Sequence, residues 1–140
     1  CGKSDFEDFA APYLKELFNC LDVRVKFFHN DADGRVCGPY LSELGINLFN
    51  FSFLHSLSEM RQLAGEEVGL VGNIPGRDVL VGGSDRQISD WILEQADGLE
   101  NLRGIMFSCG GGMPDGVSSK NIESFCRAVE RVRSKYGQKQ

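Results

Sequence analysis

Hydrophobic residues recur three and four positions apart over the first 20 residues, and this spacing predicts one amphipathic helix. Its apolar stripe comprises Phe6, Phe9, Ala10, Tyr13, Leu14, Leu17 and Phe18. Ser4 and Glu7 have the spacing of a capping box at the start of this helix. Pro12 lies in its interior and predicts a kink, because proline removes a backbone hydrogen bond.

Beyond residue 22 the pattern alternates between short apolar runs, typical of strands, and longer runs with helical spacing. Strands are expected over 23–28, 46–51, 68–71 and 104–108. Polar or glycine-rich turns follow three of them, over 29–34, 72–76 and 109–116. Helices are expected over 36–44, from Ser56 to Gly65, and from Ser84, where Gln87 completes a capping box. The last helix is expected to turn inward Ile122, Phe125, Cys126, Val129 and Val132.

Strands that alternate with helices predict βαβ units and hence a parallel sheet. Two architectures meet this requirement, an open doubly wound sheet and part of an eight-stranded barrel. No Gly-x-Gly-x-x-Gly follows the first strand, and the glycine run over 110–112 follows the last. The expected fold is therefore α/β, half of a (β/α)8 TIM-type barrel: four parallel βα units preceded by one helix, with 1–140 as a single segment.

The amino-acid composition indicates which broad class of protein the chain belongs to. The chain has 140 residues, a net charge of -5 and 41% hydrophobic residues, a balance that indicates an ordinary globular domain. No apolar run is long enough to span a bilayer, and no basic stripe is available for nucleic acid. The five cysteines are not closely paired and no signal peptide precedes them, so we expect a cytoplasmic protein. Because the sequence begins at Cys1, it is expected to be a piece of a longer chain.

The candidate chemistry lies just after the strands, where parallel α/β folds carry their active sites. His29 and Asp31 follow the first expected strand, and Cys109 follows the fourth. These residues offer one nitrogen, one oxygen and one sulfur donor, which is enough for a catalytic zinc with an open position. Taken singly, His29 and Asp31 fit a hydrogen-bonded loop pair, and Cys109 fits a small buried residue.

Other polar residues occupy the same edge. Asn73 follows the third expected strand. Its side chain could either form a hydrogen bond that shapes the turn or contact the substrate, and the sequence favours neither role over the other. The expected substrate-binding residues are Asn30, Asn50, Ser108 and Met113. Four further residues are expected to have no chemical role, with His55 a surface or capping residue and Cys20, Cys37 and Cys126 packing residues.

The ordered motifs resemble the uroporphyrinogen decarboxylase superfamily from about Phe6 to the end of the chain. Its most specific parts are Gly72 and Asn73 followed by Pro75, and the glycine-rich turn ending in Met113 and Pro114. The full series of matching segments is Pro12–Leu14, His29–Asp31, Leu44–Asn47, Leu70–Pro75, Val79–Gly83, Ser108–Pro114 and Asn121–Ile122. The resemblance implies a (β/α)8 barrel about twice this length, with this chain as its C-terminal half.

Two branches of the superfamily differ at the site. True uroporphyrinogen decarboxylases remove acetate carboxyls from a tetrapyrrole without a cofactor, using Asp and Arg from the N-terminal half. They carry a His after the last strand, where this sequence has Gly110. Corrinoid-dependent methyltransferases hold zinc with a His-x-Cys after the first of these strands and a Cys after the last. His29 and Cys109 match that set, with Asp31 in place of the middle Cys.

The resemblance therefore implies methyl transfer of the O-demethylating type, with Asn73 and Asp31 as catalytic residues and zinc on His29, Asp31 and Cys109. A corrinoid carried by a partner protein would accept the methyl group. Two alternatives stay open. One is tetrapyrrole decarboxylation in porphyrin biosynthesis. The other is a non-catalytic half-barrel that pairs with a copy of itself or with a separate N-terminal half.

Overall fold

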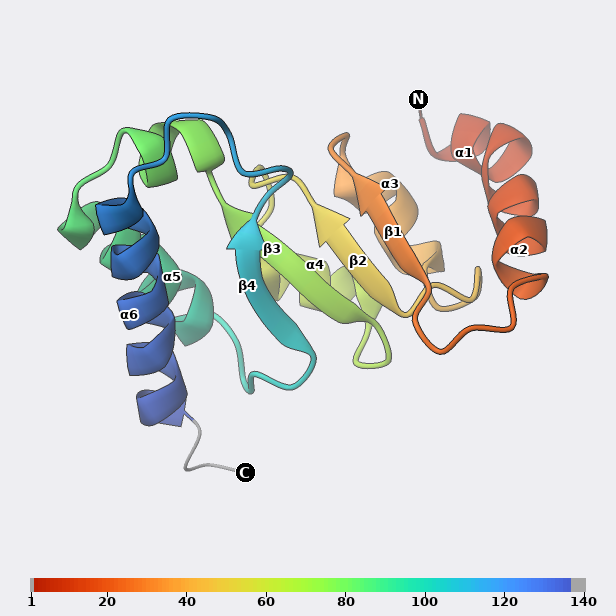
Figure 1. The fold of residues 1–140 in the computed structure, drawn as a ribbon. Coiled ribbons are helices and arrows are strands. Elements are labelled where there is room, and N and C mark those ends of the chain that lie inside the picture. Colours follow the sequence, from red (N-terminus) through yellow and green to blue (C-terminus); the bar gives the residue numbers. More distant parts are fainter. Residues whose placement is uncertain (1, 137–140) are drawn as a thin grey trace.

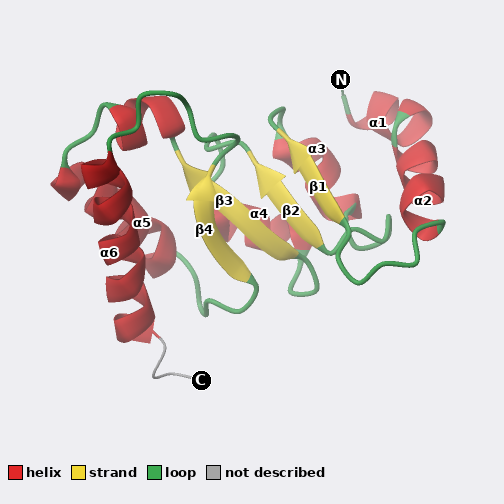
Figure 2. Cartoon of the chain, viewed as in Figure 1, coloured by secondary structure: helices red, strands yellow, loops and turns green. Residues whose placement is uncertain are grey.

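Four strands pair side by side in their order along the chain, β1-β2-β3-β4, in the computed structural model, which describes residues 2–136 (Figure 1). The strands are β1 (Phe27–Asn30), β2 (Leu48–Phe51), β3 (Gly69–Ile74) and β4 (Ile105–Cys109). All three pairings are parallel, and the four arrowheads in Figure 2 point the same way. This confirms the predicted sheet of four βα units.

Helices precede the sheet and follow every strand. They are α1 (Lys3–Phe9), α2 (Ala11–Asn19), α3 (Gly34–Cys37) with the 3-10 turn Gly38–Tyr40, α4 (Leu57–Ala64), the π-helix Gly76–Val81, α5 (Asp85–Asp97) and α6 (Ser119–Tyr136). In Figure 1 α1 and α2 lie beyond β1, whereas α5 and α6 lie beyond β4. None of the helices over the described residues is long and apolar enough to cross a membrane.

The register of the sheet sorts its side chains onto two faces. His29, Asn50, Val71 and Met106 form one row across the four strands. The neighbouring row of Phe28, Phe49, Leu70 and Ile105 points to the opposite face, because successive residues of a strand alternate. The second row packs in the core with the helices, while Met106 is 57% exposed. The first row therefore lies on the face that a complete barrel would turn inward.

The core is centred on β2. Phe49 is fully buried and stacks on Phe28 and on Phe51, with ring centroids 5.8 and 5.7 Å apart. Such aromatic pairs contribute roughly 0.5–1.5 kcal/mol each beyond the area they bury. Helix α4 covers this region as predicted, with the Ser56 side chain accepting a hydrogen bond from the backbone N–H of Glu59. It ends at Gly65, which has a positive φ of 75°.

The leading helix is divided rather than kinked. α1 ends at Phe9 and α2 begins at Ala11, with Pro12 in the first turn of α2, where its missing N–H has no helical partner to lose. The predicted cap at Ser4 is wrong, because α1 begins at Lys3. Instead, the backbone N–H of Gly2 donates to Asp5 Oδ2 at 2.9 Å.

Several element boundaries differ from the prediction, and in the strands this is because pairing partners, not hydrophobicity alone, set where a strand begins and ends. β1 begins at Phe27 instead of residue 23, and Val23 and Val25 are exposed. β3 continues to Ile74, because β4 pairs with it as far as Cys109. The predicted helix over 36–44 is replaced by α3, which begins at Gly34 and ends at Cys37, and by the 3-10 turn Gly38–Tyr40, which contains Pro39.

The π-helix Gly76–Val81 was not predicted from the sequence. Hydrogen bonds from Asn121 of α6 hold its carboxyl end in place. Asn121 Nδ2 donates to the carbonyl oxygen of Leu80 at 2.8 Å and to those of Val81 and Gly83 at 3.3 Å each. The two protons of a single side-chain amide are therefore shared among three carbonyl groups at and just beyond a helix end.

The inward face of α6 agrees with the expected one only in part. Ser124, Ala128 and Val132 are its buried residues, whereas Ile122 and Cys126 are exposed. α6 packs against α5, where Ser124 Oγ donates to Asp85 Oδ1 at 2.5 Å. Of the residues expected to face inward, Val132 is buried and Phe125 and Val129 pack against the same core cluster. Ile122 and Cys126 instead line an apolar pocket of about 240 Å³ at the edge of β4.

Candidate functional site

His29 lies inside β1 near its carboxyl end, and two polar side chains contact its ring. Nδ1 is 2.7 Å from Asn50 Oδ1, on the neighbouring strand β2. Nε2 is 3.2 Å from Asp31 Oδ2, two residues along the same chain segment. Asp31 therefore lies on the same side as His29, as the spacing predicted. The His29 and Asp31 side chains are 43% and 64% exposed, so a ligand can reach both from the inner face.

Asn50 connects this pair to the rest of the sheet. It is 6% exposed, and its Nδ2 donates to the carbonyl oxygens of Val71, at 2.7 Å, and of Cys109, at 3.1 Å. These bonds reach from β2 to β3 and β4. The Asn50 amide is thus fully occupied within the chain, and the substrate contact expected of it stays a prediction.

The glycine-rich turn after β4 crosses the ends of the other strands. A Cβ atom on Gly111 would lie 3.1 Å from Asp31 Oδ1, and one on Gly110 would lie 2.6 Å from the backbone nitrogen of Phe53. Gly111 also has a positive φ of 112°, which favours glycine. Close approach to the Phe53 backbone therefore requires glycine at position 110, the positive φ favours glycine at position 111, and the turn places Gly111 beside the Asp31 side chain.

Cys109 lies on the other face of the sheet from His29. Met106 lies in the same row as His29, so its side chain is on the same face of the sheet. Side chains alternate between the two faces along a strand, and Cys109 comes three residues after Met106, so its side chain lies on the opposite face. Its side chain packs in a cluster with Ile74 and Leu80, and burial raises the pKa of its thiol. A buried thiol with a raised pKa resists forming the thiolate that binds metal.

The structure therefore brings together His29 and Asp31 but does not add Cys109 to them. Among residues 2–136, no group of three His, Cys, Asp or Glu side chains is placed to hold a metal ion. The residues present do not fit the zinc set expected from the sequence, and we derive no catalytic step through zinc.

A metal measurement tests this geometry. We expect Cys109→Ser to leave the zinc content of the purified protein equal to that of the wild type, because the thiol lies on the opposite face from His29. His29→Ala serves as the comparison, since it removes a donor from the inner face. Zinc is measured per chain by inductively coupled plasma mass spectrometry. Zinc bound by the wild type and lost in Cys109→Ser would contradict the arrangement described here.

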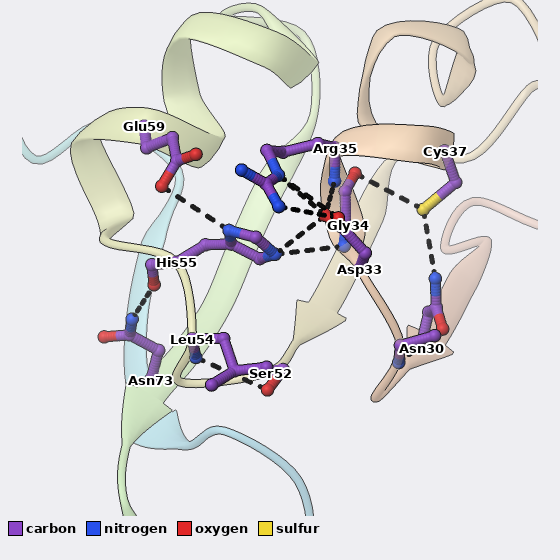
Figure 3. A network of polar contacts seen from close by, with 11 residues as sticks. Asn30, Asp33, Gly34, Arg35, Cys37, Ser52, Leu54, His55, Glu59 and Asn73 are labelled. Atoms are coloured by element: carbon purple, nitrogen blue, oxygen red, sulfur yellow. Dashed lines mark hydrogen bonds and ion pairs between the residues drawn. The ribbon is translucent and has the colours of Figure 1, made fainter. Parts of the chain in front are cut away.

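Asn73 lies in β3 and is 1% exposed. Its Nδ2 donates to the backbone carbonyl of His55, as Figure 3 shows. Its Oδ1 is buried without a hydrogen-bond partner. The Asn73 amide thus connects β3 to the loop between β2 and α4, and both the turn-shaping and the catalytic role expected of Asn73 stay predictions.

His55 was expected to be a surface or capping residue, and the surface alternative is wrong, because its side chain is only 5% exposed. Its Nε2 accepts a hydrogen bond from the backbone N–H of Gly34 at 3.2 Å and lies 3.2 Å from Asp33 Oδ1. Nδ1 lies 3.4 Å from Glu59 Oε2 on the other side of the ring (Figure 3). His55 therefore joins the loop after β1 to the start of α4. The feature of the sequence that could have indicated this contact is the spacing of His55 and Glu59, which lie one helical turn apart.

Asp33 is the N-cap residue of α3, and its hydrogen bonds shift the pKa of its carboxyl group strongly. Its side chain accepts hydrogen bonds from the backbone N–H and the guanidinium of Arg35. The Arg35 hydrogen bonds hold the pKa of Asp33 well below its usual range. Asp33 is thus charged at neutral pH beside the His55 ring.

The remaining candidates are spread over the same edge. Asn30 is held within the chain, since Nδ2 donates to Cys37 Sγ at 3.2 Å and Oδ1 accepts from the N–H of Ala32 at 2.9 Å. Ser108 is half-buried, and Met113 is 60% exposed. Of the packing cysteines, Cys37 is buried, whereas Cys20 and Cys126 are exposed.

The family model described as Uroporphyrinogen decarboxylase (URO-D) matches residues 2–132. The chain belongs to the uroporphyrinogen decarboxylase family. A search of curated proteins finds no match.

A solved structure, described as a methyltransferase from Methanosarcina mazei, has the same fold. It superposes with a TM-score of 0.77 at 17% sequence identity, over 94% of this chain. This family member spans 38% of the length of that methyltransferase chain. Together with four parallel strands in one sheet, this coverage identifies the fold as half of a TIM-type barrel.

Proposed function

We propose that this chain forms the C-terminal side of a methyltransferase barrel and that the His29–Asp31 pair acts on a methyl donor of the ether type. The observation that carries the proposal is the placement of this pair, which is exposed on the inner face and held by a buried amide. Both residues lie at the carboxyl end of a parallel strand, where barrels of this class do their chemistry.

The proposed reaction transfers a methyl group from an ether to a nucleophilic acceptor. The carbon–oxygen bond breaks, its electron pair goes to the oxygen, and the methyl carbon bonds to the acceptor. His29 Nε2 donates a proton to the departing oxygen, so that an alcohol or phenol leaves. Asp31, 3.2 Å away, stabilises the protonated ring before transfer. By family resemblance, the acceptor is a corrinoid on a partner protein, which supplies nucleophilic cobalt when bound.

Gly110 supports methyl transfer over decarboxylation. Decarboxylases of this family carry a histidine in the turn where this chain has Gly110. Here a Cβ at that position would lie 2.6 Å from the Phe53 nitrogen, so the turn has no room for a side chain. A polar side chain on β1, by contrast, is present and accessible in His29.

The experiment is an assay of the complete barrel with an aryl methyl ether as donor and reduced cobalamin as the acceptor. We expect phenol to form, detected by mass spectrometry. Uroporphyrinogen is assayed in parallel. Formation of coproporphyrinogen without phenol would replace this proposal with the decarboxylase.

We further propose that the barrel is closed by an unlike half rather than by a second copy. The described residues supply four strands but five helical layers, which are the leading pair α1–α2 and one layer after each strand. A closed eight-stranded barrel has one helix for each strand. Two copies of this chain would supply ten helical layers, although an eight-stranded barrel has places for only eight helices. A different half with four strands and three helices would bring the totals to eight strands and eight helical layers.

The solution state of the chain tests this proposal. We expect the chain alone not to form a stable two-chain particle with protected edges. Sedimentation gives the mass, and amide hydrogen exchange reports whether β1 and β4 are paired at their outer edges. A dimer in which both edge strands are protected would favour self-association, the alternative in which the half-barrel closes on a copy of itself.

A further inference from the structure

We infer that Asn50 is a positioning residue that selects the tautomer of His29, placing the ring proton on Nδ1 and leaving Nε2 to face Asp31. The inference deepens the proposed function and rests on it for its catalytic meaning. Its evidence is the set of hydrogen bonds around the Asn50 amide, which fixes what each atom can do.

The orientation of the amide follows from its two backbone partners. Asn50 Nδ2 lies 2.7 Å from the carbonyl oxygen of Val71 and 3.1 Å from that of Cys109. Carbonyl oxygens only accept hydrogen bonds, so the amide NH2 group must point to them. Rotation of the amide by 180° would set oxygen against oxygen in a buried site, with the loss of both bonds.

The orientation of Asn50 then decides the state of His29. With Nδ2 on the carbonyls, Oδ1 is the atom that faces His29 Nδ1 at 2.7 Å. An amide oxygen has no proton to give, so Nδ1 must carry one. In the neutral ring the other nitrogen, Nε2, is then unprotonated, because neutral imidazole has one N–H.

This assignment places the reactive nitrogen where the chemistry needs it. Nε2 lies 3.2 Å from Asp31 Oδ2, on the accessible side of the ring. It takes up a proton there, next to a carboxylate that pairs with the charged ring, and it donates that proton to a leaving oxygen. Asn50 itself is buried and does not touch the substrate, so its action passes through His29.

The chain is well suited to a direct test, because it contains only two histidines. Nitrogen-15 labelling of histidine gives two imidazole spectra, which long-range proton–nitrogen NMR resolves into protonated and unprotonated nitrogens. The variants His29→Gln and His55→Gln assign them. We expect wild-type His29, measured at a pH where its ring is neutral, to show a protonated Nδ1 and an unprotonated Nε2.

Two substitutions of Asn50 separate its role from simple packing. Asn50→Leu keeps the approximate size but removes the acceptor, and we expect the ratio of Nδ1–H to Nε2–H tautomer to fall roughly tenfold, the equivalent of one hydrogen bond. Asn50→Asp keeps an acceptor oxygen and should retain the Nδ1–H form. The His55 spectrum, which should not change, reports that the fold is intact.

Two results would overturn the inference: wild-type His29 protonated on Nε2 alone, or an unchanged tautomer ratio in Asn50→Leu. The wild-type measurement decides by itself should Asn50→Leu fail to fold. No substrate enters the experiment, so its outcome is separate from the proposed function. A protein with the Nδ1–H tautomer that demethylates no ether would retain this inference and lose the methyltransferase proposal.

Discussion

His29→Ala is expected to lower the rate of ether demethylation by the complete barrel by about 10²–10⁴-fold, the usual contribution of a general acid. The ring is the group of the inner-face pair that can take up a proton at Nε2, beside Asp31, and donate it to the leaving oxygen. Removal of the ring leaves Asp31 without its partner, and the leaving oxygen must then depart unprotonated. Because the proton moves in the transition state, we expect kcat to fall and KM to change little.

The control for this measurement is Arg86→Ala. Arg86 lies on α5, its side chain is 90% exposed, and its partner is Asp90 one turn along the same helix. Exposed pairs of this kind contribute little to stability, so activity should equal that of the wild type. A His29→Ala protein with wild-type kcat would refute the acid role of His29.

Gly110→Ala is expected to destabilise the protein by about 1–3 kcal/mol, the usual cost of forcing extra atoms into a packed site. The new Cβ would lie 2.6 Å from the Phe53 nitrogen and 3.2 Å from the Phe51 carbonyl oxygen. Both are backbone atoms of the β2 end, so they cannot rotate away as a flexible side chain could. The change in the free energy of unfolding is measured by urea denaturation of wild type and variant.

Gly112 provides the matched control in the same turn. A Cβ there would have nothing within 4 Å, so Gly112→Ala should stay within about 0.5 kcal/mol of the wild type. If Gly110→Ala were as stable as Gly112→Ala, the turn would not lie against β2 as described.

The order of the elements could be predicted because each helix and strand has its own hydrophobic spacing. The boundaries were less certain, since hydrophobic residues such as Val23 and Val25 resemble a strand but have no neighbour to pair with. The face of α6 was predicted only in part, for a related reason. Its Ser124 is polar and nevertheless buried, because Asp85 of α5 accepts its hydrogen bond.

The site was predictable where the relevant residues are neighbours in sequence and less so where they are not. His29 and Asp31 are two apart, and alternation along an extended chain placed both on one side. Whether the Cys109 side chain lies on the same face as His29 and Asp31 depends on the register of β4. Pairing with β3 fixes that register, and no pattern in the sequence around Cys109 indicates it. The burial of His55 likewise depends on contacts with Gly34, 21 residues away.

The bonds from Asn121 to the end of the π-helix have a consequence for the order of events during synthesis. Asn121 is separated from Leu80 by 41 residues, and until α6 is present those carbonyl oxygens have no such donor. A ribosome adds about 5–20 residues per second, so the first three strands exist for several seconds with this segment unfinished. The segment that follows β3 therefore gains these hydrogen bonds only after Asn121 of α6 has been synthesised.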